Sequence, residues 1–486
     1  MAITMPVSAS APALDPAFVA SFRRGKLTDA QADQFLGRDP LELKLLLLQL
    51  SAAMAASTIP IGPNTPSGAI APFLKVPPAD AKKRRKKSGA KPGHQGVARA
   101  VPSRIDRRVE HRLPLCPCCS GKLRRTGRKR VRYVEDIPDD LHAETTEHTV
   151  HRDWCPKCKK QVEPVVPDAL PQCQIGHRTA TLSAWLHYGI GTTTSQVADV
   201  LNGHLQLKIT TGGLQQIWHR MAQTLMPWYE RIQMRCLESA VLHADETSWR
   251  DAASLAWLWC FCCDDSTYYM IHPKRGHEAL KVFFTGAFEG VLVTDFWKAY
   301  DTITLSRQKC WPHLLRELAD IDDGKKDNRD DWPEFSKKLW RLYGDAIRLR
   351  ARIDDLDDAA YDRKVACLYT RMADLAVAAW RNPHAQRLAD RLLKYGDDLL
   401  TFVELPEVPP SNNKAEREVR PTVMMRNVSQ GCVGKRGCET RSIPMSIYRT
   451  PKIRGLDPLS VTEEALENYT LTGILPPLPE KIGSGS

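Results

Sequence analysis

Three acidic residues, far apart in this chain of 486 residues, constrain its fold more than any other feature. Asp245 and Asp295 end the apolar segments 240–245 and 290–295, so each is predicted at the rim of a buried strand. Glu416 lies in the opening turns of a predicted helix. Carboxylates that converge in this way repel one another unless a cation lies between them. We therefore expect a site for Mg²⁺ or Mn²⁺, the hard cations that bind oxygen ligands, and a two-ion phosphoryl transfer.

Other acids close in sequence fit such a site less well. Glu246 follows Asp245 directly on a strand, so its side chain is expected on the opposite face. Asp301 lies past the end of its strand. Glu418 lies two positions after Glu416, roughly 200° round a helix, so the two cannot enter one site. We therefore choose Asp245, Asp295 and Glu416.

The order of predicted elements indicates the fold class. Strands are expected at 240–245, 254–263 and 267–271, then a helix at 277–286 and a strand at 290–295. Three antiparallel strands, a helix and a parallel strand are the order of a ribonuclease-H-like α/β core. We predict this multidomain arrangement with the core at 239–312 and 406–470, interrupted by a helical insertion at 313–405.

Polar and basic residues around the third acid are predicted to bind DNA. Asn412 and Asn413 can cap the helix that carries Glu416 and contact phosphate. Basic residues follow at Arg417 and Arg420. His313 can hydrogen-bond a phosphate or orient a water, although a lone histidine can equally be structural.

Two Cys-x2-Cys turns predict a structural Zn²⁺ site within 111–165. The turns are Cys116–Cys119 and Cys155–Cys158, with 35 residues between them. Each turn can point two thiolates at one ion, and two turns complete a tetrahedral site with no open position. Strands expected at 130–134 and 144–150 would build a zinc ribbon. On count alone Cys118 can replace Cys116, whereas the spacing favours Cys116.

Positive charge is concentrated in one stretch of the chain. Residues 82–132 hold 19 Lys and Arg against two acids, a balance of +17, so the remainder of the chain sums to −5 of the net +12. Such a stretch is typical of a polyanion-binding arm, and the alternative is a solvated linker. The predicted phosphate-binding residues of this arm are Lys82, Lys83, Arg84, Arg85, Lys86 and Lys87, and their contribution should fall with salt.

The remaining segments complete the predicted organisation. Residues 1–38 are expected to be weakly ordered, and 39–58 to form a leucine-rich helix that either dimerises as a zipper or packs in a core. Residues 59–110 are a linker with the basic arm. Helices in 176–236 form either a DNA-reading helix-turn-helix or a structural bundle. Residues 471–486 are a tail that ends in a Gly-Ser remnant of cloning.

No apolar run is long enough to span a bilayer, and the first residues lack the basic-then-apolar pattern of a signal peptide. We therefore expect a cytoplasmic protein associated with the bacterial nucleoid and no membrane partner. The fourteen cysteines indicate metal binding in a reducing compartment rather than a disulfide scaffold.

Short motifs in a fixed order give a family resemblance. They are Lys91–Gly96, the two cysteine turns, His187-Tyr188-Gly189, Asp245-Glu246-Thr247, Thr294-Asp295 with Tyr300, Cys310-Trp311-Pro312-His313, Asn412-Asn413 with Glu416-Arg417, and Gly455–Pro458. Through them the chain, from about Leu41 to Leu466, resembles a bacterial DDE transposase of the insertion-sequence sixty-six group. It departs from the group's aromatic, basic stretch at 427–432.

The resemblance implies a catalytic triad of Asp245, Asp295 and Glu416, a zinc-binding domain and a zipper-like segment. It also implies cleavage and rejoining of double-stranded DNA at element ends. We expect a homo-oligomer, a dimer, which accessory proteins of the element can assist. Two alternatives are open: a hydrolytic nuclease or resolvase of the same fold, which never joins strands, and a non-enzymatic DNA-binding regulator.

Overall fold

The computed structural model describes residues 101–124, 130–138, 140–303, 306–324, 326–429 and 431–481. The predicted N-terminal segment 1–38, the leucine-rich helix, the linker as far as residue 100 with the arm Lys82–Lys87, and the Gly-Ser end lie outside the described residues. Within those ranges, no helix combines the length and the apolar character that crossing a membrane requires.

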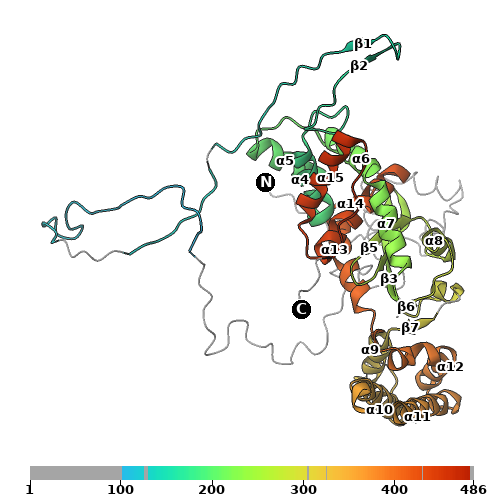
Figure 1. Ribbon diagram of the computed structural model, residues 1–486. Coiled ribbons are helices and arrows are strands. Elements are labelled where there is room, and N and C mark those ends of the chain that lie inside the picture. Colours follow the sequence, from blue (N-terminus) through green and yellow to red (C-terminus); the bar gives the residue numbers. More distant parts are fainter. Residues whose placement is uncertain are drawn as a thin grey trace, which may run out of the picture. The chain divides into compact units, whose positions relative to one another are not determined.

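A five-stranded mixed sheet organises the chain (Figure 1). Its strands are β3 (Val241–Asp251), β4 (Ser254–Cys262), β5 (Thr267–His272), β6 (Val291–Thr294) and β7 (Arg307–Lys309), in the order β5-β4-β3-β6-β7. The first three strands pair antiparallel, whereas β6 runs parallel to β3 and β7 runs parallel to β6. Helix α8 (His277–Phe283) makes the crossover from β5 to β6. The fold is therefore mixed α/β with additional helical segments.

Both faces of the sheet are covered, which explains its composition. In β4 the side chains of successive residues, from Leu258 to Cys262, are all buried. Strands buried on both sides lose the alternation of apolar and polar residues. One core packs β3, β4 and β5 against neighbouring helices, with Phe261 and Phe283 stacked at 3.7 Å between ring centroids. A second core receives Val291 and Val293 of β6.

The helices before the sheet form a bundle that joins the first core. They are α4 (His177–Ala184), the π-helix η3 (Trp185–Ile190), α5 (Thr194–His204), α6 (Thr211–Thr224) and α7 (Met226–Leu237). The hydroxyl of Thr193 and the side chain of Gln196 form a capping box at the start of α5. Trp218 of α6 stacks on His187 within the buried core. The helices thus pack as a bundle, and both roles considered for them, structural support and DNA reading, stay predictions.

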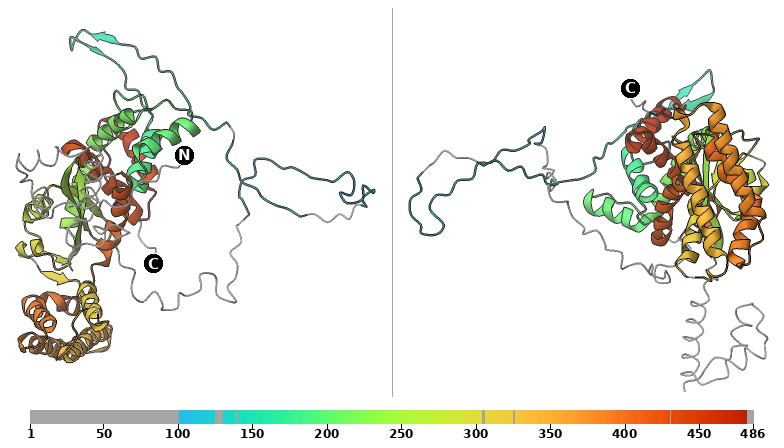
Figure 2. Two further views of the ribbon diagram at one scale, coloured as in Figure 1. Left: turned by 180° about the vertical axis from the view of Figure 1, so that it is seen from behind. Right: turned by 90° about the horizontal axis from the view of Figure 1, so that it is seen from below.

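Four long helices follow β7. They are α9 (Trp311–Asp322), α10 (Trp332–Arg350), α11 (Asp358–Val377) and α12 (Pro383–Glu404), with the short 3₁₀ turn η5 (Ile353–Asp355) between α10 and α11. Figure 1 and the right-hand view of Figure 2 show α10, α11 and α12 side by side. Their apolar faces meet in the second core, and α12 contacts β7.

Three C-terminal helices follow: α13 (Asn413–Ser429), α14 (Gly434–Ile453) and α15 (Pro458–Thr472). Helices α13 and α14 pack on the sheet, whereas α15 packs on α14 and on α4. Helix α14 lies along the edge strand β5. Its hydroxyls at Ser442, Ser446 and Thr450 accept hydrogen bonds from the backbone N–H groups of alternate β5 residues. The three pairs, Ile271–Ser442, Tyr269–Ser446 and Thr267–Thr450, have lengths of 3.2, 2.9 and 3.2 Å.

The segment with the cysteine turns has less regular structure than we expected. Its strands are β1 (Asp153–Cys155) and β2 (Lys160–Val162), which pair as one small hairpin. The strands predicted at 130–134 and 144–150 are not formed, so that prediction was wrong. Val131 and Val134 are 71% and 74% exposed. A β-branched pattern forms a strand when a partner strand and a buried face are available, and these residues have neither.

Candidate functional site

Asp245 lies on β3, and Asp295 directly follows the neighbouring parallel strand β6 at an equivalent position. The β3–β6 register pairs Val241 with Val291 and His243 with Val293, an offset of fifty residues. The same offset separates Asp245 from Asp295, two positions beyond the last pair. Because side chains alternate along a strand, both acids leave the sheet on the same side as His243 and Val293.

The environment of Asp245 disfavours its charge. Burial raises the pKa of Asp245 well above its usual value, and the carboxylates of Glu246, Asp295 and Glu416 raise it further. The N–H of Glu246 donates to Asp245 Oδ1 at 2.9 Å and partly opposes this effect. The charges of Asp295 and Glu416 therefore both influence the protonation of Asp245.

Glu246 is held by partners of its own. Its carboxylate accepts hydrogen bonds from Arg275 Nε at 3.0 Å and from the hydroxyl of Tyr300 at 2.6 Å. The Arg275 guanidinium lies between the rings of Trp257 and Trp297, at 4.5 and 3.9 Å from their centroids. Burial and the nearby Asp295 nevertheless raise the pKa of Glu246 to about 7. This buried network explains why Glu246 is not a free ligand, and the sequence did not predict it.

Glu416 is positioned by the start of α13. Asn412, the residue before this helix, is buried, and its side-chain nitrogen donates to the carbonyl of Ala244 on β3 at 2.7 Å. Its side-chain oxygen lies 3.1 Å from His243 Nδ1. These bonds join the helix to β3 next to Asp245. Asn412 thus has a structural role that we did not predict, and a phosphate contact from it stays a prediction.

Two further side chains lie against Glu416. His313 Nε2 is 3.8 Å from Glu416 Oε1, and Cys310 is buried close by. One donor atom from each of Cys310, His313 and Glu416 lies within 4.8 Å of the other two, and no other such trio of Asp, Glu, His or Cys occurs in the described part of the chain. The oxygens of Asp245, Asp295 and Glu416 therefore do not meet this close spacing together. The sequence analysis named Cys310 only as part of a family motif and gave it no role in a site, although its spacing to His313 was a usable signal.

A buried lysine forms a hydrogen bond with the backbone of Asp295. Lys309 of β7 is fully buried, and its Nζ donates to the Asp295 carbonyl at 3.0 Å and to Thr294 Oγ1 at 3.2 Å. Asp301 lies 3.5 Å from the same ammonium and also accepts bonds from α12. Asp301 is thus neutralised by lysines and belongs to the packing between the sheet and the helices. Lys309 was invisible to sequence analysis because it lies in a short polar segment.

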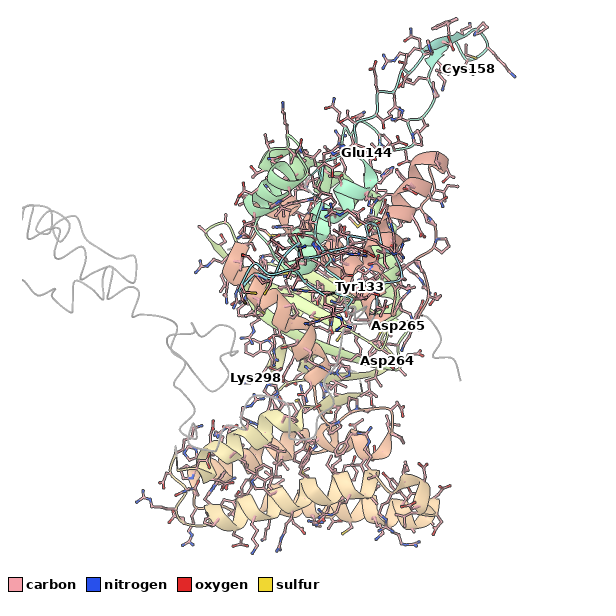
Figure 3. All side chains as sticks on the ribbon, turned by 90° about the vertical axis from the view of Figure 1, so that its left-hand side faces the viewer. Tyr133, Glu144, Cys158, Asp264, Asp265 and Lys298 are labelled. Carbon is pink, nitrogen blue, oxygen red and sulfur yellow. The ribbon has the colours of Figure 1, made fainter. Side chains whose placement is uncertain are left out.

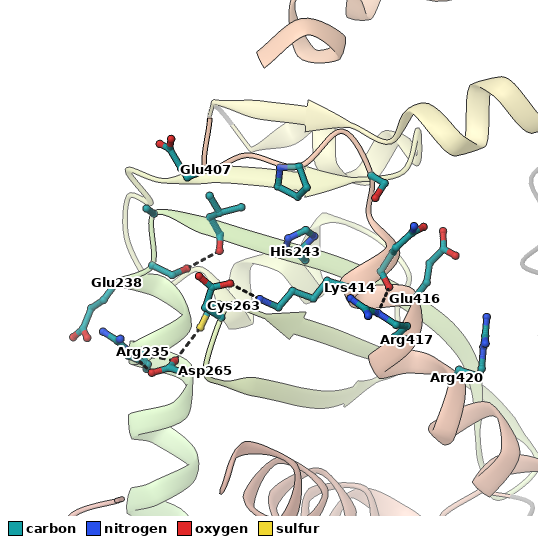
Figure 4. Close-up of a pocket in the computed structure, with 17 residues that line it drawn as sticks. Arg235, Glu238, His243, Cys263, Asp265, Glu407, Lys414, Glu416, Arg417 and Arg420 are labelled. Atoms are coloured by element: carbon teal, nitrogen blue, oxygen red, sulfur yellow. Dashed lines mark hydrogen bonds and ion pairs between the residues drawn. The ribbon is translucent and has the colours of Figure 1, made fainter. Parts of the chain in front are cut away.

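Glu416 also lines a cavity of about 880 Å³ (Figure 4). Glu416, Arg417 and Arg420 of α13 line it, whereas Asp245 and Asp295 do not. Lys414 crosses it to bond Asp264 Oδ1 at 2.6 Å. Arg417 and Arg420 are exposed, as is Asn413, so these predicted phosphate contacts are accessible.

The two cysteine turns have matching local geometry. The residue after the second cysteine, Ser120 or Lys159, has a positive φ of 55° or 51°. Backbone N–H groups lower the pKa of Cys116 and of Cys155. Figure 3 labels Cys158 in the β1–β2 turn. The four sulfurs do not gather into one group within the described residues. The structure thus gives two thiol turns suited to a metal, and their joint site stays a prediction.

Comparison with known proteins adds the family. A family model described as "Transposase IS66 family" matches residues 172–440, more than half of the chain. The chain belongs to this family. The match includes Asp245, Asp295 and Glu416 and leaves out both cysteine turns.

This IS66-family member is also similar to proteins without an assigned function. Uncharacterized protein y4hP of Sinorhizobium fredii (strain NBRC 101917 / NGR234) is 22% identical over 382 residues, covering 71% of this chain and 68% of the relative. Uncharacterized protein y4jD of the same strain is 23% identical over 419 residues, covering 77% and 80%. Membership of the IS66 family supports a transposase-type function that acts on DNA.

Proposed function

We propose that this protein is a DDE transposase with a ribonuclease-H-like core. In this proposal it cleaves double-stranded DNA at the ends of its insertion element and joins the freed 3′-OH to target DNA. The observation that carries the proposal is the common offset of fifty residues between the β3–β6 register and the pair Asp245 and Asp295. Family membership and the strand order β5-β4-β3-β6-β7 agree with it.

The chemistry of these residues fits a divalent cation. Burial and three neighbouring carboxylates raise the pKa of Asp245, so a divalent cation would offset the repulsion between these acids. Glu416 Oε1 is buried without a hydrogen-bond partner. Asp245, Asp295 and Glu416 would hold Mg²⁺ or Mn²⁺. When bound, such ions supply charge stabilisation for the attacking and leaving oxygens of a phosphoryl transfer.

The surrounding side chains would keep the acids in place and receive the DNA. Lys309 fixes the backbone at Asp295 through its carbonyl. The Asn412 amide fixes the first turn of α13 to β3 beside Asp245. Arg417 and Arg420, exposed on the helix of Glu416, are suited to phosphate oxygens of the bound strand.

The decisive experiment compares Asp245→Asn with the wild-type chain on DNA that carries candidate element ends, with Mg²⁺. The substitution keeps the size of the side chain and removes its charge, so nicking and joining should fall by at least about 1000-fold. DNA binding should be retained. Glu334→Gln is the matched control, because Glu334 is exposed on α10 and forms an ion pair with Lys338, away from the proposed site. Retained nicking in Asp245→Asn would refute the triad.

A second substrate separates transposase from nuclease. DNA whose element end is already cut to a 3′-OH gives joined product if the protein transfers strands. A hydrolytic nuclease or resolvase gives nicked DNA in the first assay and no joined product in the second. A non-enzymatic regulator gives neither.

We further propose that the cysteine turns hold one structural Zn²⁺. Matching turn geometry and lowered thiol pKa values support this. Zinc measured in purified protein should fall by one equivalent in Cys116→Ser and in Cys155→Ser. The same variants should lose binding to DNA ends while the catalytic core stays folded. An unchanged zinc content would exclude this site.

A further inference from the structure

Cys310, His313 and Glu416 come together where two helices begin. Cys310 occupies the N-cap position of α9, and His313 lies in its first turn. Glu416 lies in the first turn of α13. One donor atom from each residue lies within 4.8 Å of the other two. The sequence brings the first two together by a Cys-x2-His spacing, and the fold adds the third from a position about one hundred residues later.

Hydrogen bonds outside the trio hold it in this arrangement. The N–H of Asn412, next to α13, donates to Cys310 Sγ at 3.1 Å. The N–H of Trp311 donates to the carbonyl of Pro410 at 3.0 Å. The starts of α9 and α13 are therefore joined directly by the backbone. The geometry of the trio does not depend on long flexible side chains alone.

Two polar atoms of the trio have unmet bonding capacity. Glu416 Oε1 and the far ring nitrogen of His313, Nδ1, are buried and have no hydrogen-bond partner. An ion bound by Glu416 Oε1 and His313 Nε2 would satisfy the first of these atoms. A buried polar atom without a hydrogen-bond partner lowers the stability of the folded protein, so its presence needs a physical reason. The 3.8 Å between His313 Nε2 and Glu416 Oε1 is too long for a hydrogen bond. It is near the separation of roughly 3.3–3.8 Å between two ligands of a tetrahedral ion with bonds of about 2.0–2.3 Å.

The donor types select the class of metal. A thiolate, an imidazole and a carboxylate suit a borderline-soft cation such as Zn²⁺, whereas Mg²⁺ prefers oxygen ligands and keeps its waters. We propose that Cys310, His313 and Glu416 form a Zn²⁺ site that competes with the catalytic cation for Glu416. The binding site stands on its own geometry, and the competition rests on the proposed function. Zinc bound here would hold Glu416 toward α9 and away from Asp245 and Asp295.

Binding is tested by metal content in the full-length protein. Wild-type protein loaded with Zn²⁺ and desalted should hold one equivalent more than Cys310→Ser or His313→Ala. Cys367→Ser is the matched control, because Cys367 is exposed on α11 and should leave the content unchanged. The cysteine turns contribute equally to all four proteins, so they cancel. Equal zinc in wild type, Cys310→Ser and His313→Ala overturns the site.

A spectroscopic measurement covers the case in which Cys310→Ser does not fold. After the turns are filled with Zn²⁺, Co²⁺ should produce a thiolate-to-metal absorption band in the wild type. The band should weaken or shift in Glu416→Gln and His313→Ala, both of which keep Cys310. An unaltered band in these variants overturns the ligand assignment.

The competition is tested by adding Zn²⁺ at constant Mg²⁺ in the nicking assay. Wild-type nicking should fall at least 10-fold, and His313→Ala, normalised to its own rate without zinc, should resist. Zinc that binds without inhibiting overturns the competition. Asp245→Asn should bind zinc as the wild type does. Absence of nicking under every condition would refute the proposed function and leave the zinc measurement as a separate result.

Discussion

Asn412 donates a hydrogen bond of 2.7 Å from its side-chain nitrogen to the backbone carbonyl of Ala244, the residue before Asp245. The bond is buried and spans 168 positions of the chain. It joins the strand that carries the first acid to the helix that carries the third. The relative placement of Asp245 and Glu416 therefore depends on an amide that is itself neither an acid nor a ligand.

Removing this amide should loosen the connection. Asn412→Ala leaves the Ala244 carbonyl and His243 without their partner in a buried place, which should lower the free energy of unfolding by about 1–3 kcal/mol. Urea denaturation measures this change. The adjacent Asn413 is exposed, so Asn413→Ala should stay within about 0.5 kcal/mol of wild type. Equal losses of stability in Asn412→Ala and Asn413→Ala would contradict the role of Asn412 in joining α13 to β3.

The raised pKa of Glu246 predicts a pH-dependent contribution to stability. A carboxyl with a pKa of about 7 in the folded protein and 4.5 when unfolded binds more protons when folded. Its contribution is therefore present at low pH and is lost as pH rises through about 7. Buried His187 and His243 act in the opposite direction, because burial lowers their pKa values to about 3 and about 4. The test must therefore compare variants at each pH.

The comparison uses Glu246→Gln, which cannot titrate. Without divalent cations, the stability advantage of wild type over this variant should shrink by about 2 kcal/mol between pH 5 and pH 8. Urea denaturation at several pH values gives the difference. Exposed Glu334→Gln should show no such trend. An advantage that grows with pH would mean that the Arg275 pair outweighs burial.

Gly290 should tolerate no side chain. A Cβ there would collide with the carbonyl of Ser239 and lie 2.7 Å from that of Ala240, which accepts the N–H of Val291. Gly290→Ala should push β6 away from β3 and cost roughly 1–3 kcal/mol in thermal or urea unfolding. Gly286→Ala, in open space four residues earlier, is the control and should be nearly neutral. A neutral Gly290→Ala would show that the strand pair can separate at its start.

Asp301 should be needed for the packing of α12 on the sheet. It lies 3.5 Å from the buried ammonium of Lys309 and accepts bonds of 2.6 Å from Lys394 and Tyr395. Asp301→Ala leaves the Lys309 charge without its carboxylate and should destabilise the protein by about 3 kcal/mol or more. Asp390→Ala, exposed on α12, is the comparison. Hydrogen exchange should rise in α12 and β7 for Asp301→Ala alone; unchanged protection there would argue against the contact.

Much of the sheet was predictable because its strands are apolar and are separated by short turns. The segments predicted at 254–263, 267–271 and 290–295 correspond to β4, β5 and β6 within two residues at either end. The strand predicted at 240–245 extends to Asp251, so Asp245 lies inside β3 and not at its end. The paired positions of Asp245 and Asp295 follow from these strands.

Other features depend on long-range contacts that no local pattern reveals. Strand β7 consists of Arg307, Gln308 and Lys309, and the last two are fully buried although polar. Gln308 forms hydrogen bonds with the backbone of Leu399 and Phe402 on α12, and Lys309 with the Asp295 carbonyl, so hydrophobic periodicity cannot detect these residues. The Cys310 contact with Glu416 likewise arises from the meeting of two helix starts. The local spacing of residue types was therefore enough to predict helices and strands. The partners of buried polar side chains could be found only from the folded structure.

The three hydroxyls of α14 along β5 also restrict how copies of this protein can assemble. The backbone N–H groups that another chain's strand would need on that edge are already engaged by Ser442, Ser446 and Thr450. A dimer that extends the sheet at the β5 edge would first require helix α14 to be displaced from that edge. Any oligomer of this protein is therefore expected to associate through other surfaces and to leave the β5 edge covered by α14.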